Sequence, residues 1–498
     1  MRSRDEWARL AGAISVRDRL FIDGSWVSAR DGREFETVNP ANGAVIASVA
    51  RGASDDVDLA VGAARSAFER RAWAGAPPRE RKRVLLRLAQ LIRENAEELA
   101  LLDSIDGGRL IGDTTSYDVP EAARTLQWYA EVIDKQYGEV APTGPGDLAV
   151  ITREPVGVVG AVVPWNFPLG TAIWKIAPSL AAGNSVVLKP AEQSPLSALR
   201  LAELGAEAGL PDGVLNVVTG FGPEVGRALG EHPDIDVLCF TGSTRVGKVF
   251  LGYAARSNMK QVWLECGGKS ANVVFADVAD LDRVADRAVF GIFGSSGQVC
   301  SANSRLVVEE SIAEELVARI ESRATALVIG DPLDPMTEMG PLISQAQLES
   351  VLGHVDAART ESSLAFGGDA TLGETGGFYL EPTAFVGVAT SARLAQEEVF
   401  GPVLAVSTFR SEEEAIAIAN GTQYGLAASL FTDDLRRAHR VASALRAGTV
   451  SVNTVDALDV TTPFGGVKAS GFGRDLSLHA LDKYTALKTT WFVHDTEG

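Results

Sequence analysis

The stretch GVVGAVVPWNFP, residues 157–168, sets the fold prediction. It begins as a run of small and β-branched apolar residues, which is typical of a strand buried on both faces, and then ends abruptly in polar and aromatic residues. The same pattern recurs in NSVVLKP (184–190), GVLNVVTG (213–220), DVLCFTG (236–242) and KQVWLECGG (260–268). We therefore expect a sheet of short buried strands.

Helical segments separate several of these strands. The clearest is SPLSALRLAELGAEAGLP (194–211), where Ser194 is the predicted N-cap, Pro195 the first helical residue and Gly209 the C-terminal stop. Strands that alternate with helices predict a parallel, doubly wound sheet. Before this series, RLFIDGSWV (19–27) looks like a short strand, and residues 79–108 show apolar positions at helical spacing.

A second series of strands begins near residue 270. It consists of ANVVFAD (271–277), SRLVVEE (304–310), GLAASLFT (425–432) and GTVSVN (448–453). The fold class we predict is therefore α/β, with two doubly wound α/β domains and a boundary just after Gly267–Gly268.

Composition excludes several function classes. The chain has 498 residues, 46 basic and 65 acidic side chains and a formal net charge of −19. It has no basic cluster, which argues against nucleic acid or an anionic membrane as a partner. Three cysteines are too few for a disulfide framework, and we find no signal peptide or bilayer-length apolar run. We predict a cytoplasmic protein.

Polar residues cluster at one predicted sheet edge. Four strands of the first series end at Pro164–Asn166, Lys189, Gly242–Ser243 and Glu265. Open α/β sheets bind their ligands at the carboxyl ends of parallel strands, so we predict a site there. A helix cap or loop role remains the alternative for each residue taken alone.

The segment GQVCSA (297–302) places Cys300 directly after the small residues GSSGQ. A structural cysteine is normally a small buried hydrophobe, whereas Cys300 follows a segment that looks exposed, so a nucleophile and a packing residue both stay open here. GSTRVGKV (242–249) nearly matches the phosphate loop of nucleoside triphosphatases, but Val249 stands where that loop needs a hydroxyl for Mg²⁺. The glycine turn suits a pyrophosphate, although no G-x-G-x-x-G fingerprint follows a strand.

Seven motifs together resemble the aldehyde dehydrogenase superfamily over nearly the whole chain. They are PWNFP (164–168), KPAEQSP (189–195), FTGSTRVG (240–247), LECGGKSAN (264–272), GQVC (297–300), EEVFGPV (397–403) and PFGGVKASGFGRD (463–475). Residues 128–142, 257–265 and 473–491 look most like γ-glutamyl-γ-aminobutyraldehyde and 4-guanidinobutyraldehyde dehydrogenases.

The resemblance implies NAD-dependent oxidation of an aldehyde to its acid. Cys300 matches the nucleophile that forms a thiohemiacetal and then a thioester, and Asn166 matches the oxyanion donor together with the Cys300 N–H. Glu265 matches the base that activates the hydrolytic water. We expect Cys239 to be a core residue, Cys266 to pack near the cofactor or form an oxidation adduct with Cys300, and no metal site.

The resemblance also implies a cofactor site and a substrate funnel. The cofactor residues it implies are Trp165, Lys189, Glu192, Gly242, Ser243, Glu398 and Phe400. Because Glu192 would repel a 2′-phosphate, we expect NAD to be preferred and NADP to be weaker. The funnel residues are Phe167, Gly170, Trp174, Gly294, Asp456, Leu458, Asp459 and Phe464.

The funnel departs from the family pattern. Gly170 and Gly294 replace large side chains, Ser295 replaces an asparagine, and Asp456 and Asp459 remain where neighbouring glycines are lost to Ala457 and Leu458. We expect an ω-amino, ω-guanidino or otherwise bulky aldehyde whose distal group faces the two aspartates. An aromatic aldehyde is the alternative substrate.

Domains and partners also follow from the resemblance. It implies a cofactor-binding domain (1–134, 155–267 and 469–482), a catalytic domain (268–468) and a β-arm for oligomerisation (135–154 and 483–498) in a homodimer or tetramer. Three rival functions stay open: a catalytically silent binding protein, a dehydrogenase that passes the thioester to coenzyme A, and a nucleoside triphosphatase.

Overall fold

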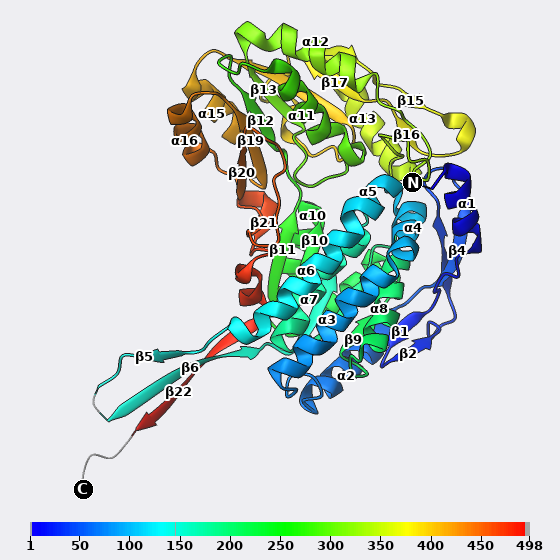
Figure 1. Cartoon of the computed structure of the whole chain (residues 1–498), viewed down its shortest axis with the longest axis vertical. Coiled ribbons are helices and arrows are strands. Elements are labelled where there is room, and N and C mark those ends of the chain that lie inside the picture. The colour runs from blue at the N-terminus through cyan, green and yellow to red at the C-terminus, as the bar shows by residue number, and fades with distance from the viewer. Residues whose placement is uncertain (1, 145, 494–498) are drawn as a thin grey trace.

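The computed structural model describes residues 2–144 and 146–493. Residue 145 and residues 494–498, which belong to the two predicted arm segments, lie outside the described residues. Figure 1 shows two α/β units, one above the other, and a ribbon of strands that projects from the lower unit. The predicted α/β class with two parallel-sheet units is confirmed.

The lower unit is built on an eight-stranded sheet. Five central strands, in the order β9-β8-β7-β10-β11, are parallel, whereas β1 and β2 at one edge and β21 at the other run antiparallel to their neighbours. The chain leaves β7 in both directions across the sheet, which makes the fold doubly wound. The strands are β1 (Leu20–Ile22), β2 (Ser25–Val27), β7 (Val158–Val162), β8 (Ser185–Lys189), β9 (Leu215–Val217), β10 (Val237–Gly242), β11 (Gln261–Cys266) and β21 (Gly471–Phe472).

Helices cover both faces of this sheet (Figure 1). α7 begins with a proline, whose fixed φ suits the first helical position, and α7 and α8 each end at a glycine in the left-handed conformation. The main helices are α2 (Ser54–Glu69), α3 (Pro78–Glu94), α4 (Ala96–Gly107), α6 (Val119–Val132), α7 (Pro168–Ala182), α8 (Leu196–Ala208) and α10 (Thr244–Arg256). The smaller elements are α1 (Arg4–Ala13), α5 (Ile111–Asp113), α9 (Arg227–Glu231) and a hairpin of β3 (Glu34–Val38) and β4 (Val45–Ala50).

The upper unit is built on a seven-stranded sheet in the order β14-β17-β18-β13-β12-β19-β20. Only β14 runs antiparallel to its neighbour. The strands are β12 (Ala271–Val274), β13 (Arg305–Glu309), β14 (Ser363–Phe366), β17 (Thr383–Val386), β18 (Val403–Phe409), β19 (Ala427–Phe431) and β20 (Thr449–Val452). The helices are α11 (Leu281–Phe293), α12 (Ala313–Ala324), α13 (Gln345–Glu361), α14 (Arg393–Gln396), α15 (Glu412–Asn420) and α16 (Leu435–Ala444), and β15 (Ala370–Thr371) pairs with β16 (Tyr379–Leu380).

The projecting ribbon is a three-stranded antiparallel sheet, β22-β6-β5 (Thr485–Val493, Asp147–Pro155, Glu139–Ala141). β22 and β6 pair along nine residues, so the end of the chain is held against a segment more than 300 positions earlier. Large apolar side chains stay exposed on it, among them Val140, Leu487, Trp491 and Phe492. Within residues 2–144 and 146–493, no helix is both long and apolar enough to cross a membrane.

The structure differs from the expected elements in four places. The strand expected at 19–27 is a hairpin, and the helical pattern at 79–108 is two helices that meet at Asn95. The helix after Lys189 begins at Leu196, because the Ser194 hydroxyl donates to the Trp165 carbonyl (3.3 Å) and caps no helix N–H. Strands β14, β17 and β18 were not predicted.

Candidate active site

The carboxyl ends of the first sheet bring the predicted edge residues together. Val162, the last residue of β7, lies opposite Lys189 in β8 and Phe240 in β10, and Thr241 lies opposite Glu265 in β11. Asn166 lies four residues beyond the end of β7, and Ser243 follows β10 as the N-cap of α10. Backbone pairing therefore aligns these residues along one edge.

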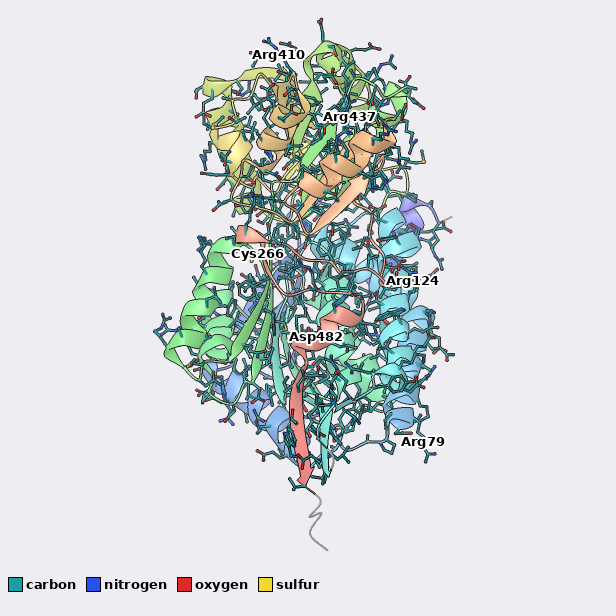
Figure 2. The ribbon with its side chains drawn as sticks, turned by 90° about the vertical axis from the view of Figure 1, so that its left-hand side faces the viewer. Arg79, Arg124, Cys266, Arg410, Arg437 and Asp482 are labelled. Atoms are coloured by element: carbon teal, nitrogen blue, oxygen red, sulfur yellow. The ribbon has the colours of Figure 1, made fainter. Side chains whose placement is uncertain are left out.

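The second sheet meets this edge with the amino ends of its strands. Gly268 precedes β12, Cys300 precedes β13, and Glu398 and Phe400 precede β18. Gly268 lies so close to the nucleophile loop that a Cβ added to it would be 2.7 Å from the Cys300 carbonyl oxygen. Figure 2 shows Cys266, the last residue of β11, at the level where the two units meet.

Cys300 is half-buried and its thiol is free. Burial, together with the nearby carboxylates of Glu265, Asp456 and Glu398, raises the pKa of this thiol well above its usual value. Both effects disfavour a thiolate, because they desolvate the negative charge and place like charges beside it. A base is therefore needed to remove the thiol proton at neutral pH.

Glu265 is the candidate base, because its carboxyl group interacts with this thiol. It is 5% exposed, and burial raises its pKa to about 8, while the cation of Lys175 and a hydrogen bond from the Cys300 thiol offset part of the rise. Oε1 has no hydrogen-bond partner among the described residues. A buried carboxyl with one unpaired oxygen and a pKa near the working pH is suited to accept and release protons.

Asn166 is held by the nucleophile loop itself. Its Nδ2 donates to the Gln298 carbonyl, two residues before Cys300, at 2.8 Å. An amide nitrogen carries two N–H groups, so one anchors the side chain and the other remains available. This places an oriented neutral donor beside the thiol, as stabilisation of an oxyanion requires.

The predicted adenosine end of the cofactor site lies at β8 and α10. Lys189 is buried, and its Nζ donates to the Pro190 carbonyl (2.8 Å) and to Glu192 Oε2 (3.3 Å). Ser243 Oγ accepts from the Val246 N–H (3.3 Å), and it sits with Gly242 at the positive end of α10. A cation, a carboxylate and a helix N-terminus match the hydroxyls and pyrophosphate of a dinucleotide.

The predicted nicotinamide end lies across the cleft between the sheets. The Trp165 and Phe400 rings meet edge to face with centroids 5.2 Å apart. The Gly268 N–H donates to Glu398 Oε1 (3.1 Å), and a Cβ on Gly267 would collide with Glu398 Oε2 at 1.9 Å. Burial raises the pKa of Glu398 to about 7. The residues present therefore fit a dinucleotide.

Aromatic and aliphatic side chains surround Cys300. The predicted funnel residues Trp174 and Phe464 pack edge to face at 5.4 Å, and Leu458 and Cys300 contact the same apolar cluster. The remaining members of the cluster were not predicted as site residues: Trp128, Leu426, Val460 and Leu476.

The two funnel glycines border open space. A Cβ on Gly170 would meet only Phe167 Cβ, at 3.9 Å, and a Cβ on Gly294 would meet only the Phe290 ring, at 3.8 and 3.9 Å. Phe290 is 59% exposed and sits one turn before Gly294, at the end of α11. It is therefore an unpredicted aromatic neighbour of the space left at Gly294.

The two predicted funnel aspartates, Asp456 and Asp459, differ from each other in their contacts. Asp456 Oδ1 accepts from Ser301 Oγ (2.5 Å), next to the nucleophile. Asp459 pairs with Arg124 (2.7 Å) and accepts from the Thr461 N–H and hydroxyl, and these donors hold its pKa below the usual range. Arg124 therefore already neutralises the negative charge of Asp459.

Two further residues, Gln298 and Lys175, shape the site and were not predicted as site residues. Gln298 Oε1 accepts from the Ile343 N–H (2.9 Å), which fixes the loop before Cys300. Lys175 pairs with Asp475 in the buried interior and lowers the pKa of Glu265. The position of Gln298 inside GQVC could have suggested a role, whereas Lys175 lies in a helix with nothing to mark it.

The other two cysteines are buried. Cys239 is fully buried among Val159, Val237 and Tyr484, as predicted for a core residue. Cys266 is a free thiol whose pKa burial and Glu265 raise to about 12, and its Sγ would lie 2.9 Å from a Cβ on Gly247 in α10. Its predicted redox adduct with Cys300 stays a prediction.

Comparison with known proteins agrees with this geometry. Residues 26–490 match the model of the aldehyde dehydrogenase family. The chain is 53% identical, over 97% of both sequences, to the NADP/NAD-dependent aldehyde dehydrogenase PuuC of Escherichia coli.

Two solved structures extend the match to three dimensions. Gamma-glutamyl-gamma-aminobutyraldehyde dehydrogenase from Burkholderia cenocepacia is 52% identical with a TM-score of 0.97, over 99% of this chain and 100% of that one. A mutant of the P. syringae indole-3-acetaldehyde dehydrogenase AldA, in complex with NAD+ and IAA, is 50% identical with a TM-score of 0.98 and the same coverage. This chain belongs to the aldehyde dehydrogenase family.

Proposed function

We propose that the protein oxidises an aldehyde to its carboxylic acid with NAD+ as the electron acceptor. One observation carries the proposal. The Cys300 side chain interacts with the buried Glu265 carboxyl and offsets part of the rise in its pKa, while Asn166 is anchored to the backbone two residues before the thiol. This assembles a nucleophile, a base and an oxyanion donor in one place.

The chain's own residues account for the proton and bond changes. Glu265 accepts the thiol proton as the sulfur of Cys300 bonds to the aldehyde carbon, and Asn166 stabilises the oxygen of the resulting thiohemiacetal. When bound, NAD+ supplies the acceptor for the two electrons and the hydrogen of the aldehyde C–H. Glu265 releases that proton to solvent, then takes a proton from the water that cleaves the thioester and returns it to the departing Cys300 thiolate, so aldehyde, NAD+ and water yield acid, NADH and one proton.

The cofactor is assigned to the cleft between the sheets. Lys189 and Glu192 would hold the adenosine ribose, the N-terminus of α10 with Gly242 and Ser243 the pyrophosphate, and Glu398 the nicotinamide ribose. Glu192 favours NAD over NADP, because a 2′-phosphate would meet its carboxylate, although Lys189 at 3.3 Å softens the repulsion.

The substrate we propose is a longer amino aldehyde. Relatives named for amino aldehydes include γ-glutamyl-γ-aminobutyraldehyde dehydrogenase, whose named substrate is a long one, and an aminoacetaldehyde dehydrogenase of Pseudomonas aeruginosa, 50% identical. Gly170 and Gly294 leave room for a long chain, and Asp456 beside Ser301 offers a carboxylate.

An aromatic aldehyde is the second candidate. The observation that favours it is the apolar cluster of Trp128, Trp174 and Phe464 around Cys300. The structure of AldA, an indole-3-acetaldehyde dehydrogenase that is 50% identical to this chain, supports it by its TM-score of 0.98.

We further infer that the two sheets are separate functional units. The first sheet, with residues 1–134, 155–267 and 469–482, would bind the cofactor, and residues 268–468 would carry the nucleophile. The β22-β6-β5 ribbon, with its exposed Leu487 and Trp491, suits a homodimer or tetramer contact. Three free thiols fit a reducing cytoplasm.

A panel of aldehydes tests the proposal. Purified protein with NAD+ should form NADH with at least one amino or aromatic aldehyde, and the product should be the free acid with or without coenzyme A. Absence of NADH with the whole panel would overturn the proposal. A thioester product in the presence of coenzyme A would replace hydrolysis by acyl transfer.

A further inference from the structure

Arg109 links the two units directly beside the nucleophile loop. It follows α4 in the lower unit, is 6% exposed, and holds Asp118 through two bonds, Nε to Oδ2 (2.8 Å) and Nη2 to Oδ1 (3.1 Å). The remaining nitrogen, Nη1, donates to Ser295 Oγ in the upper unit. The carboxylate thus fixes the guanidinium plane and leaves one donor for the loop.

An aromatic ring fixes the same guanidinium from a third side. Arg109 Cζ lies 4.3 Å from the centroid of the Phe167 ring, within the range of a cation–π contact. Phe167 follows Asn166 and leads into α7. Arg109 therefore spans the gap between the loop that carries Asn166 and the loop that leads to Cys300.

The loop that Arg109 contacts has an unfavourable backbone. Ser295 and Ser296 have φ values of 50° and 56°, and Gly297 follows at 69°, so three consecutive residues are left-handed. For residues other than glycine this conformation costs energy and persists only where surrounding contacts impose it. Ser296 is held by its hydroxyl, which donates to the Gly340 carbonyl (2.7 Å), and Ser295 is held by Arg109.

Hydrogen bonds connect Ser295 to the reacting groups. The Gln298 N–H donates to the Ser295 carbonyl (3.1 Å), and the Gln298 carbonyl accepts from Asn166 Nδ2 (2.8 Å). Cys300 follows two residues later. A change in the Ser295 conformation would therefore displace both the oxyanion donor and the thiol.

We propose that Arg109 is a positioning residue for the nucleophile loop. By binding Ser295 while Asp118 and Phe167 hold its guanidinium, it keeps the left-handed backbone in place and so aligns Cys300 with Asn166. The inference rests on the proposed function for the roles of Cys300 and Asn166.

The test separates this contact from general loss of structure. Ser295→Ala removes only the hydroxyl that accepts from Arg109. Ser295→Asn restores a hydrogen-bond acceptor in a residue that tolerates the left-handed region. Arg109→Lys keeps the positive charge beside Asp118 but loses the planar guanidinium with its several N–H donors. Arg51→Lys is the matched control, because Arg51 also forms two bonds to one carboxylate, Glu224, and stacks over a ring, Phe221, while neither interaction involves the nucleophile loop.

Three kinds of measurement are made for each variant. They are steady-state kinetics with aldehyde and NAD+ (kcat and KM), the rate at which iodoacetamide alkylates Cys300 without cofactor, and Tm. Ser295→Ala and Arg109→Lys should lower kcat and the alkylation rate about tenfold, as expected for a lost charge-assisted hydrogen bond. KM for NAD+ should not change, and Ser295→Asn should recover most of the loss. The double variant Ser295→Ala/Arg109→Lys should lower kcat by less than about twofold beyond either single variant, because both substitutions remove the same contact.

Unchanged kcat and alkylation in Ser295→Ala would overturn the proposal, as would an equal loss in Arg51→Lys or full additivity in the double variant. If Arg109→Lys lowers Tm strongly, Ser295→Ala and Ser295→Asn still test whether the contact with Arg109 positions the nucleophile loop. Alkylation needs no aldehyde chemistry, so an inactive wild type would count against the proposed function, while the alkylation rates would still test the role of Arg109.

Discussion

The catalytic centre and the mouth of the substrate funnel are built in different ways. In the centre, Glu265 is a strand residue in register with its neighbour, Asn166 follows the end of β7 closely, and Cys300 precedes β13. At the mouth, Asp456 and Asp459 lie on a loop after β20 and Gly294 ends α11. Side-chain contacts such as Arg124 with Asp459 determine the arrangement there.

This difference separates what each region can control. A position fixed by backbone pairing, such as Glu265, tolerates a side-chain change without moving its neighbours, so a substitution there should alter the chemistry alone. Positions at the mouth border open space, so substitutions there should alter which aldehyde is accepted. Variants in the two regions can confirm or contradict this division between residues that control the chemistry and residues that control substrate selection.

The largest effect is expected for the nucleophile and the base in the centre. Cys300→Ala should lower NADH formation by at least about a thousandfold, because no carbon–sulfur bond can form. Glu265→Gln should instead form about one NADH per active site, more slowly than wild type because the thiol has lost its base, and then stall at the thioester. Rapid-mixing absorbance measurements distinguish the two, and continued turnover of Glu265→Gln beyond one NADH per active site would contradict the role of Glu265 in deacylation.

The raised pKa of Glu265 predicts a pH dependence of both rate and stability. Deacylation needs the carboxylate, so kcat should rise with pH up to about 8 and then level off. In the folded protein the Glu265 carboxyl keeps its proton up to about pH 8, whereas in the unfolded chain it loses the proton near pH 4.5. Glu265 therefore makes the free energy of unfolding fall as pH rises between those two values.

Glu265→Gln removes this contribution. Its Tm relative to wild type should therefore increase from pH 6 to pH 9, which differential scanning calorimetry can measure. A constant difference between the two proteins across that range would contradict the raised pKa.

A smaller effect is expected at the cofactor end of the centre. Glu192→Gln should raise kcat/KM for NADP relative to NAD by about tenfold, because a neutral amide no longer repels the 2′-phosphate. Glu207→Gln, an exposed glutamate near the other end of α8, is the control and should leave the ratio unchanged. If wild type already uses NADP as well as NAD, this interpretation of Glu192 is wrong.

The same contrast explains how much could be predicted from the sequence. Apolar runs that end in polar residues predicted the first sheet and its site edge, because strand pairing alone aligns Lys189 and Glu265 with their neighbours. The family resemblance added Cys300 and the cofactor residues. The contacts of Asp459 with Arg124 and of Ser295 with Arg109 join segments more than 180 residues apart, and no local pattern encodes them.

The smallest and most selective effect is expected at the mouth. In Gly294→Phe the new ring would occupy the space beside Phe290, and the backbone φ of −52° accepts any side chain, so folding should be unaffected. The narrowed funnel should lower kcat/KM for a bulky aldehyde about tenfold or more but change that for propanal less than about twofold, because a pocket discriminates through the volume it leaves. Kinetics with both aldehydes measure this ratio, and Gly353→Ala, on α13 with open space around it, is the control. If propanal is already the better substrate of wild type, or if Gly294→Phe lowers both rates equally, the open space at Gly294 does not select the substrate, and the division between centre and mouth fails at this position.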